Sequence, residues 1–120
     1  MSKHTIVHVE ISAKDLAAAS KFYAELFGWE IQPMPEMNYA TFSPGKEEVG
    51  GGFNPVSEEN PAGTVLVYID TEDIEASLAK AESLGGKTLV PKTEIPGMGW
   101  FAVFSDLTGN SIGLYTGMPQ

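Results

Sequence analysis

Apolar and polar residues alternate strictly near the start of the chain, over residues 7–12. The apolar positions of this segment are Val7, Val9 and Ile11, and the polar positions are His8, Glu10 and Ser12. A period of two is typical of a strand with one buried face. Apolar side chains then recur at helical spacing from Leu16 to Leu26. The pattern therefore predicts a strand followed by a helix, which Asp15 caps and Gly28 ends.

Three further strands are expected in the first half of the chain, at residues 29–32, 39–43 and 49–53. A connector rich in proline separates the first two of them. The second half shows the same order, and its predicted elements are a strand at 64–70, a helix from Asp73 to just before Gly85, and strands at 87–90, 100–105 and 110–115. The stretch at 91–99 is predicted to be irregular. Each half therefore has the order βαβββ.

The two halves also repeat in sequence, because residues 8–31 align without a gap on residues 66–89, at an offset of 58. Looser matches follow at offsets of 62 and 63, the second of which places Gly50 on Gly113. A repeat of this length indicates supersecondary units that cannot bury their apolar faces alone. We predict one domain over residues 1–120, with a first module at about 4–54, a linker at about 55–63 and a second module at about 64–117. A cleft between two modules related by a pseudo-two-fold axis is the expected place for a site.

Composition limits the possible partners. The formal net charge of −9 provides no basic surface for nucleic acid or for an anionic membrane, so neither is expected. The chain has no cysteine, which excludes disulfides and cysteine-ligated metals. The N-terminal segment has no apolar stretch typical of a secretory signal, and we therefore expect a cytoplasmic protein.

Two segments carry a family resemblance. HVEISAKDLAAASKFYAELFGWE (residues 8–30) resembles the opening of vicinal oxygen chelate proteins, the superfamily of glyoxalases, bleomycin resistance proteins and extradiol dioxygenases. FSDLTGNSIGLY (residues 104–115) resembles the last turn and strand of that superfamily, with Leu107 where proline is common. The resemblance implies an α+β fold in which paired βαβββ modules form an open, eight-stranded, barrel-like cleft. It also implies a homodimer, as in many relatives.

The resemblance further implies where a metal would be bound. Metal-dependent members place one histidine or glutamate ligand on each of four strands, and the matching positions are His8, Gly50, Leu66 and Gly113. Glycine and leucine offer no side-chain ligand, so one imidazole alone remains. We therefore predict that the protein has neither a metal nor another cofactor.

The predicted cleft contains several candidate residues. The paired catalytic candidates are His8 and Glu10, because a carboxylate in a partly apolar cleft is suited to acid–base chemistry. Glycines at 50 and 113 are expected to enlarge the floor of the cavity, and a loop at 95–100 is expected to close over it. The predicted ligand-binding residues are His8, Glu10, Trp29, Tyr39, Gly50, Leu66, Tyr68, Met98, Trp100, Gly113 and Tyr115.

Three functions are compatible with these features. The first is a metal-free cleft that binds a small, partly aromatic or apolar organic molecule. The second is a lyase, isomerase or dioxygenase of the superfamily's types, in which His8 and Glu10 hold a non-standard metal set or Glu10 acts as a metal-free base. The third is an interaction or scaffold protein without a ligand.

Overall fold

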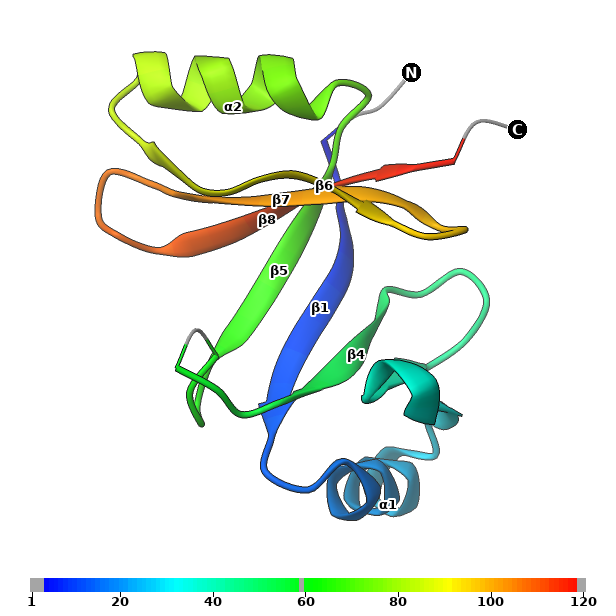
Figure 1. Ribbon diagram of the computed structural model, residues 1–120. Coiled ribbons are helices and arrows are strands. Elements are labelled where there is room, and N and C mark those ends of the chain that lie inside the picture. The colour runs from blue at the N-terminus through cyan, green and yellow to red at the C-terminus, as the bar shows by residue number, and fades with distance from the viewer. Residues whose placement is uncertain (1–3, 59, 119–120) are drawn as a thin grey trace. The chain divides into compact units, whose positions relative to one another are not determined.

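The computed structural model describes residues 4–58 and 60–118, which form two compact units (Figure 1). The N-terminal unit is Val7–Leu66, and the C-terminal unit consists of residues 67–118 together with residues 4–6. Both units have the element order βαβββ, and the described residues contain eight strands. The predicted α+β class and its division into two βαβββ modules are therefore confirmed.

The N-terminal unit follows the sequence prediction closely at its helix. Its elements are β1 (Ile6–Ala13), α1 (Leu16–Phe27), β2 (Glu30–Met34), the short 3-10 helix η1 (Pro35–Met37), β3 (Tyr39–Ser43) and β4 (Gly50–Pro55). The side chain of Asp15 accepts a hydrogen bond from the Ala18 backbone N–H at 3.0 Å, which caps α1. Gly28 ends the helix at a φ of 76°, where glycine has no steric penalty. The strands lie in the order β2-β3-β4-β1, with β1 parallel to β4.

Aromatic rings fill the space between α1 and the strands. Trp29 stacks on Phe42 with 4.6 Å between ring centroids, and on Tyr23 at 5.4 Å. Tyr23 in turn stacks on Phe53, which has no exposed surface. Val9, Ile11 and Ala13 pack against the same cluster. The apolar side of β1 therefore faces the helix, as the alternating pattern predicts.

The C-terminal unit repeats the framework. Its elements are β5 (Val65–Asp70), whose first two residues are counted with the N-terminal unit, α2 (Ile74–Ser83), β6 (Lys87–Ile95), β7 (Gly99–Ser105) and β8 (Ser111–Gly117). Asp73 caps α2 as Asp15 caps α1, since its carboxylate accepts from the Ala76 backbone N–H at 3.0 Å. The strands lie in the order β5-β8-β7-β6, and α2 lies along β6, β7 and β8 (Figure 1). The buried core of this unit is Ile74, Leu78, Ala102 and Leu114.

The predicted irregular stretch at 91–99 is wrong, because β6 continues through Pro91 as far as Ile95. The pairing of β6 with β7 shifts register on both sides of Val90, and proline is tolerated in a strand at such irregularities. Only a tight turn then connects β6 to β7, in which the Met98 backbone N–H donates to the Ile95 carbonyl at 2.9 Å. The chain therefore has a hairpin turn where we expected a long closing loop.

Strand pairing also corrects the repeat. Ala40 pairs with Phe53 in the N-terminal unit, and Ala102 pairs with Leu114 in the C-terminal unit. Glu10 pairs with Gly52, and Tyr68, its counterpart at the offset of 58, pairs with Gly113. The offset between β4 and β8 is therefore 61 rather than 63, and the offset of 62 between β3 and β7 is confirmed. Gly52, and not Gly50, is thus the counterpart of Gly113.

The helices α1 and α2 contain 12 and 10 residues. Across residues 4–58 and 60–118, no helix has the length and apolar character needed to cross a membrane.

Candidate functional site

Three side chains of the N-terminal unit form a hydrogen-bonded group, which we call the Glu10 cluster: His8, Glu10 and Tyr39. Glu10 is buried, with 8% of its surface exposed. Its Oε2 lies 2.5 Å from His8 Nε2 and accepts a short hydrogen bond from the Tyr39 hydroxyl. His8 Nε2 is also 3.0 Å from the Tyr39 hydroxyl oxygen. The structure therefore brings together two predicted catalytic candidates and one predicted ligand-binding residue.

The strand register explains how these residues meet. Tyr39 lies on β3 and Glu10 on β1, and β4 runs between them. The tyrosine side chain reaches Glu10 by crossing β4 above Gly52. A Cβ atom at residue 52 would lie 1.8 Å from the Tyr39 hydroxyl oxygen, so any side chain there would displace the ring. Gly52 is thus a positioning residue for the cluster.

Sequence reasoning did not identify Gly52 individually. The run of glycines at residues 50–52 is the available signal, because glycine within a strand permits the close approach of a ligand or of another backbone. The approach of a backbone is confirmed at Gly51, where an added Cβ would lie 1.8 Å from the Val9 carbonyl oxygen. At Gly52 the approaching group is a tyrosine ring.

The Glu10 cluster has the features of a polar recognition point. A buried carboxylate is costly unless it is hydrogen-bonded, and here two donors are available to it. Both contacts involve Oε2, which leaves Oε1 of Glu10 as the oxygen that can accept a donor from a ligand. The His8 side chain is 31% exposed, so the cluster extends from the buried carboxylate to the protein surface.

The residues do not fit the superfamily's metal set. Correcting the register leaves His8, Gly52, Leu66 and Gly113 at the four ligand positions, and His8 Nε2 already contacts Glu10 and Tyr39. Within residues 4–58 and 60–118, no group of three or more histidine, cysteine, aspartate or glutamate side chains is arranged to hold a metal ion. The donor set therefore supports no step that requires a bound metal.

The expected cavity floor at glycines 50 and 113 is wrong. A Cβ at Gly50 would lie 2.6 Å from the Phe42 carbonyl oxygen. A Cβ at Gly113 would lie 2.4 Å from the ring of Tyr68, which pairs with it across β5 and β8. These glycines make room for a neighbouring backbone and for a tyrosine ring, so they do not open empty space.

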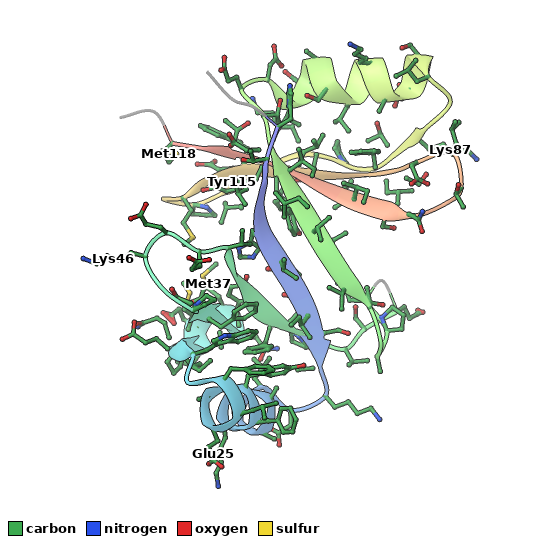
Figure 2. The ribbon with its side chains drawn as sticks, turned by 180° about the vertical axis from the view of Figure 1, so that it is seen from behind. Glu25, Met37, Lys46, Lys87, Tyr115 and Met118 are labelled. Atoms are coloured by element: carbon green, nitrogen blue, oxygen red, sulfur yellow. The ribbon has the colours of Figure 1, made fainter. Side chains whose placement is uncertain are left out.

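The remaining predicted residues lie outside the Glu10 cluster. Trp29 belongs to the aromatic core beside α1, and Leu66 is buried on β5. Trp100 packs against the core beside α2, with Lys92 Nζ 5.2 Å from its ring centroid. Tyr115, labelled on β8 in Figure 2, donates to the Met98 carbonyl at 2.7 Å. The structure thus joins Met98 to Tyr115 and Tyr68 to Gly113. Each tryptophan packs in the core beside the helix of its own unit.

Comparison with known proteins gives one family. The family model described as bleomycin resistance protein-like N-terminal matches residues 5–45. A glyoxylase-like domain-containing protein from Didymella fabae is 31% identical over 115 residues, which cover 90% of each chain. CFP32 of Mycobacterium bovis is 30% identical over 116 residues, which cover 89% of this chain and 43% of CFP32.

A solved structure shows the same fold. It is described as a glyoxalase/bleomycin resistance protein/dioxygenase superfamily member from Vibrio splendidus 12B01, with a TM-score of 0.68 and 14% identity. The match covers 93% of this chain and 97% of that one. The repeated βαβββ order, the two family segments and the identity along nearly all of a relative agree. The chain therefore belongs to the vicinal oxygen chelate superfamily, as a glyoxylase-like domain protein.

Proposed function

We propose that this protein binds a small, partly aromatic or apolar organic molecule at the Glu10 cluster, without a metal. The observation that carries this proposal is a buried carboxylate whose contacts with His8 and Tyr39 both involve Oε2. The other carboxylate oxygen is suited to accept a hydroxyl or N–H donor from the ligand. Apolar pockets with a few well-placed polar groups are the usual form of small-molecule sites.

The contacts within the cluster support preorganisation. Tyr39 and His8 hold the carboxylate in one orientation before a ligand arrives, so little ordering remains to be done on binding. Gly52 fixes the path of the tyrosine ring over β4. The donor set supports a metal-free site, because His8 is the one imidazole at the family's ligand positions.

A second candidate function is acid–base catalysis by Glu10. The 2.5 Å contact between Glu10 Oε2 and His8 Nε2 favours it, because it links a buried carboxylate to a partly exposed imidazole. In that reaction Glu10 Oε1 takes a proton from the bound molecule, and His8 and Tyr39 stabilise the carboxyl group by hydrogen bonding. The proton then returns to the molecule at another atom, which completes an isomerisation and restores the Glu10 carboxylate.

The test is a screen of small planar organic molecules by NMR, with wild type, Glu10→Gln and Tyr39→Phe. We expect ligands that shift the backbone amides of Glu10 and Gly52, and we expect Glu10→Gln to weaken them by roughly 10- to 100-fold, since it removes a charged acceptor. Tyr39→Phe should weaken them by about 3- to 10-fold. Tyr23→Phe is the matched control, because Tyr23 packs in the aromatic core beside α1.

Ligands whose affinities do not change in Glu10→Gln would contradict the proposal. Conversion of a bound compound to product, lost in Glu10→Gln while the compound still binds, would establish the catalytic function instead. The expected homodimer and the cytoplasmic location stay predictions.

A further inference from the structure

A groove of about 660 Å³ lies within the C-terminal unit, on the side of the strands that α2 covers. Its floor includes the apolar side chains of Ile69, Phe104 and Leu114. Ala81 of α2 and Leu84, the residue that follows the helix, form one wall. Leu107, in the turn before β8, forms part of its rim and is 79% exposed. All residues that line the groove belong to the C-terminal unit, so it is distinct from the Glu10 cluster.

The groove corresponds to space that the N-terminal unit fills with aromatic rings. At the offset of 58 residues, Tyr23 of α1 corresponds to Ala81 of α2, and Trp29 corresponds to Lys87. Tyr23 bridges Trp29 and Phe53 by ring stacking at 5.4 Å to each. A methyl group at residue 81 cannot span that distance, and Lys87 lies exposed at the start of β6 (Figure 2). The missing rings leave an apolar space of the size that small-molecule sites have.

Charged groups around the groove indicate the charge of the ligand that it would bind. Three carboxylates line it, those of Glu72, Asp73 and Asp106. The basic groups in the lining are the ammonium group of Lys80 and the imidazole of His4. Hydrogen bonds from its own turn, first from the backbone and side chain of Asn110, lower the pKa of Asp106 and so favour its carboxylate form. The Thr71 and Ser77 hydroxyls bond to each other at 2.8 Å and need no ligand. The excess of negative charge favours a cation over an anion.

The geometry points to a second small-molecule site in this groove, for apolar compounds that carry a cationic amine. The apolar body lies against Ile69, Phe104 and Leu114, and the amine faces the carboxylates at the rim. This site is independent of the function proposed for the Glu10 cluster, so either can fail without the other.

Three matched probes test the inference: 1-naphthylmethylamine, 1-naphthalenemethanol and 1-naphthaleneacetate. At pH 7 the first is cationic, the second neutral and the third, a carboxylate, anionic. NMR titration of the wild-type chain should show amide shifts at Ala81 and Leu84 with the amine. We expect the amine to bind at least five-fold more tightly than the acetate, with the alcohol between them. Shifts confined to the Glu10 cluster, or equal affinity for the three probes, would overturn the inference.

The decisive variant is Ala81→Tyr, which places in the C-terminal unit the side chain that fills the N-terminal unit. It should reduce amine binding by at least ten-fold while the shifts at the Glu10 cluster stay as in wild type. Ala79→Tyr is the matched control, because residue 79 is exposed on the same helix and does not line the groove. Unchanged binding in Ala81→Tyr would exclude this site.

Two further variants decide the question if Ala81→Tyr does not fold. Leu107→Ala removes part of the exposed rim and should weaken the amine about three-fold or more. Glu72→Lys reverses one rim charge and should narrow or invert the preference for the amine over the acetate. If both variants bind all three probes with the affinities of wild type, the proposed site is contradicted.

Discussion

The two units of this chain share a framework and differ in what fills it. Both begin with a strand, a helix capped by aspartate and three further strands, and Ala40 and Ala102 pair in the same register. On the corresponding side of its helix, however, the N-terminal unit has stacked rings where the C-terminal unit has an open groove. The difference shows that the two copies of the repeat share their backbone pairing and helix capping, whereas the side chains beside the helices differ between the copies.

The opposite sides of the strands differ as well. In the N-terminal unit, a tyrosine crosses Gly52 to reach the carboxylate of Glu10. In the C-terminal unit, Tyr68 occupies the position that corresponds to Glu10, and its ring covers Gly113. One unit therefore presents a buried ionisable group where the other presents an aromatic ring, which is why we assign the polar recognition point to the N-terminal unit.

The largest expected effect concerns the glycines that bring β4 close to β1. Gly51→Ala should destabilise the fold by about 3 kcal/mol or more, because the new Cβ would lie 1.8 Å from the Val9 carbonyl oxygen and only backbone movement can relieve it. Gly45→Ala is the control, since its Cβ would meet its nearest neighbour at 3.7 Å. Urea denaturation measures both, and equal midpoints for the two variants would show that β4 is not confined as described.

The next effect compares the two tryptophans. Trp29→Ala should cost about 2–3 kcal/mol, because Trp29 stacks on Phe42 and Tyr23 and also packs against Phe27. Trp100→Ala should cost about 1–2 kcal/mol, since Trp100 packs at the margin of its core beneath Lys92. Thermal and urea unfolding decide the order. A larger loss for Trp100 would reverse our account of which unit has the denser packing.

The helix caps should give matched effects, because this part of the framework is common to both units. Asp15→Ala and Asp73→Ala each remove one side-chain acceptor at 3.0 Å from a backbone N–H, and each should cost about 1 kcal/mol. The double variant should show nearly additive losses, since the caps lie on different helices. Strongly unequal losses would mean that the aspartate caps contribute different amounts to the free energy of unfolding in the two units.

The smallest effect concerns pH and the last turn of the C-terminal unit. Backbone and side-chain hydrogen bonds from Asn110, and backbone hydrogen bonds from Thr108 and Gly109, lower the pKa of Asp106. Its stabilising contribution is therefore present above the unfolded pKa of about 3.9 and is lost as pH falls through the lower folded value. The difference in melting temperature between wild type and Asp106→Asn should be largest above pH 5 and should shrink towards pH 2. A difference that grows on acidification would contradict this assignment.

Much of the fold was predictable because its signals are local. Alternation in β1 placed His8 and Glu10 on one face, and Asp15 and Gly28 marked the ends of α1. The strand through Pro91 was missed because a proline usually ends a strand, and only the pairing with β7 reveals the irregular register that admits it. Local patterns do not specify such non-local pairing.

The candidate site was predictable in part. The Tyr39–Glu10 contact requires that β3, β4 and β1 be neighbours and that Gly52 lie between the two side chains. Local sequence patterns predict neither condition. The placement of Trp100 did have a signal, since Trp100, Ala102 and Phe104 alternate as one apolar face of β7. Trp29 precedes β2, so the alternation of strand residues does not predict the side on which its ring packs.

The central claim is that the Glu10 cluster is a small-molecule site that needs no metal. The metal content of the purified protein tests this claim most directly. Cells are grown with added nickel, zinc, iron and manganese, and wild type is compared with His8→Ala by elemental analysis. We predict far less than one transition-metal ion per chain in both proteins, because His8 stands alone at the family's ligand positions. About one ion per chain in wild type, lost in His8→Ala, would contradict the account.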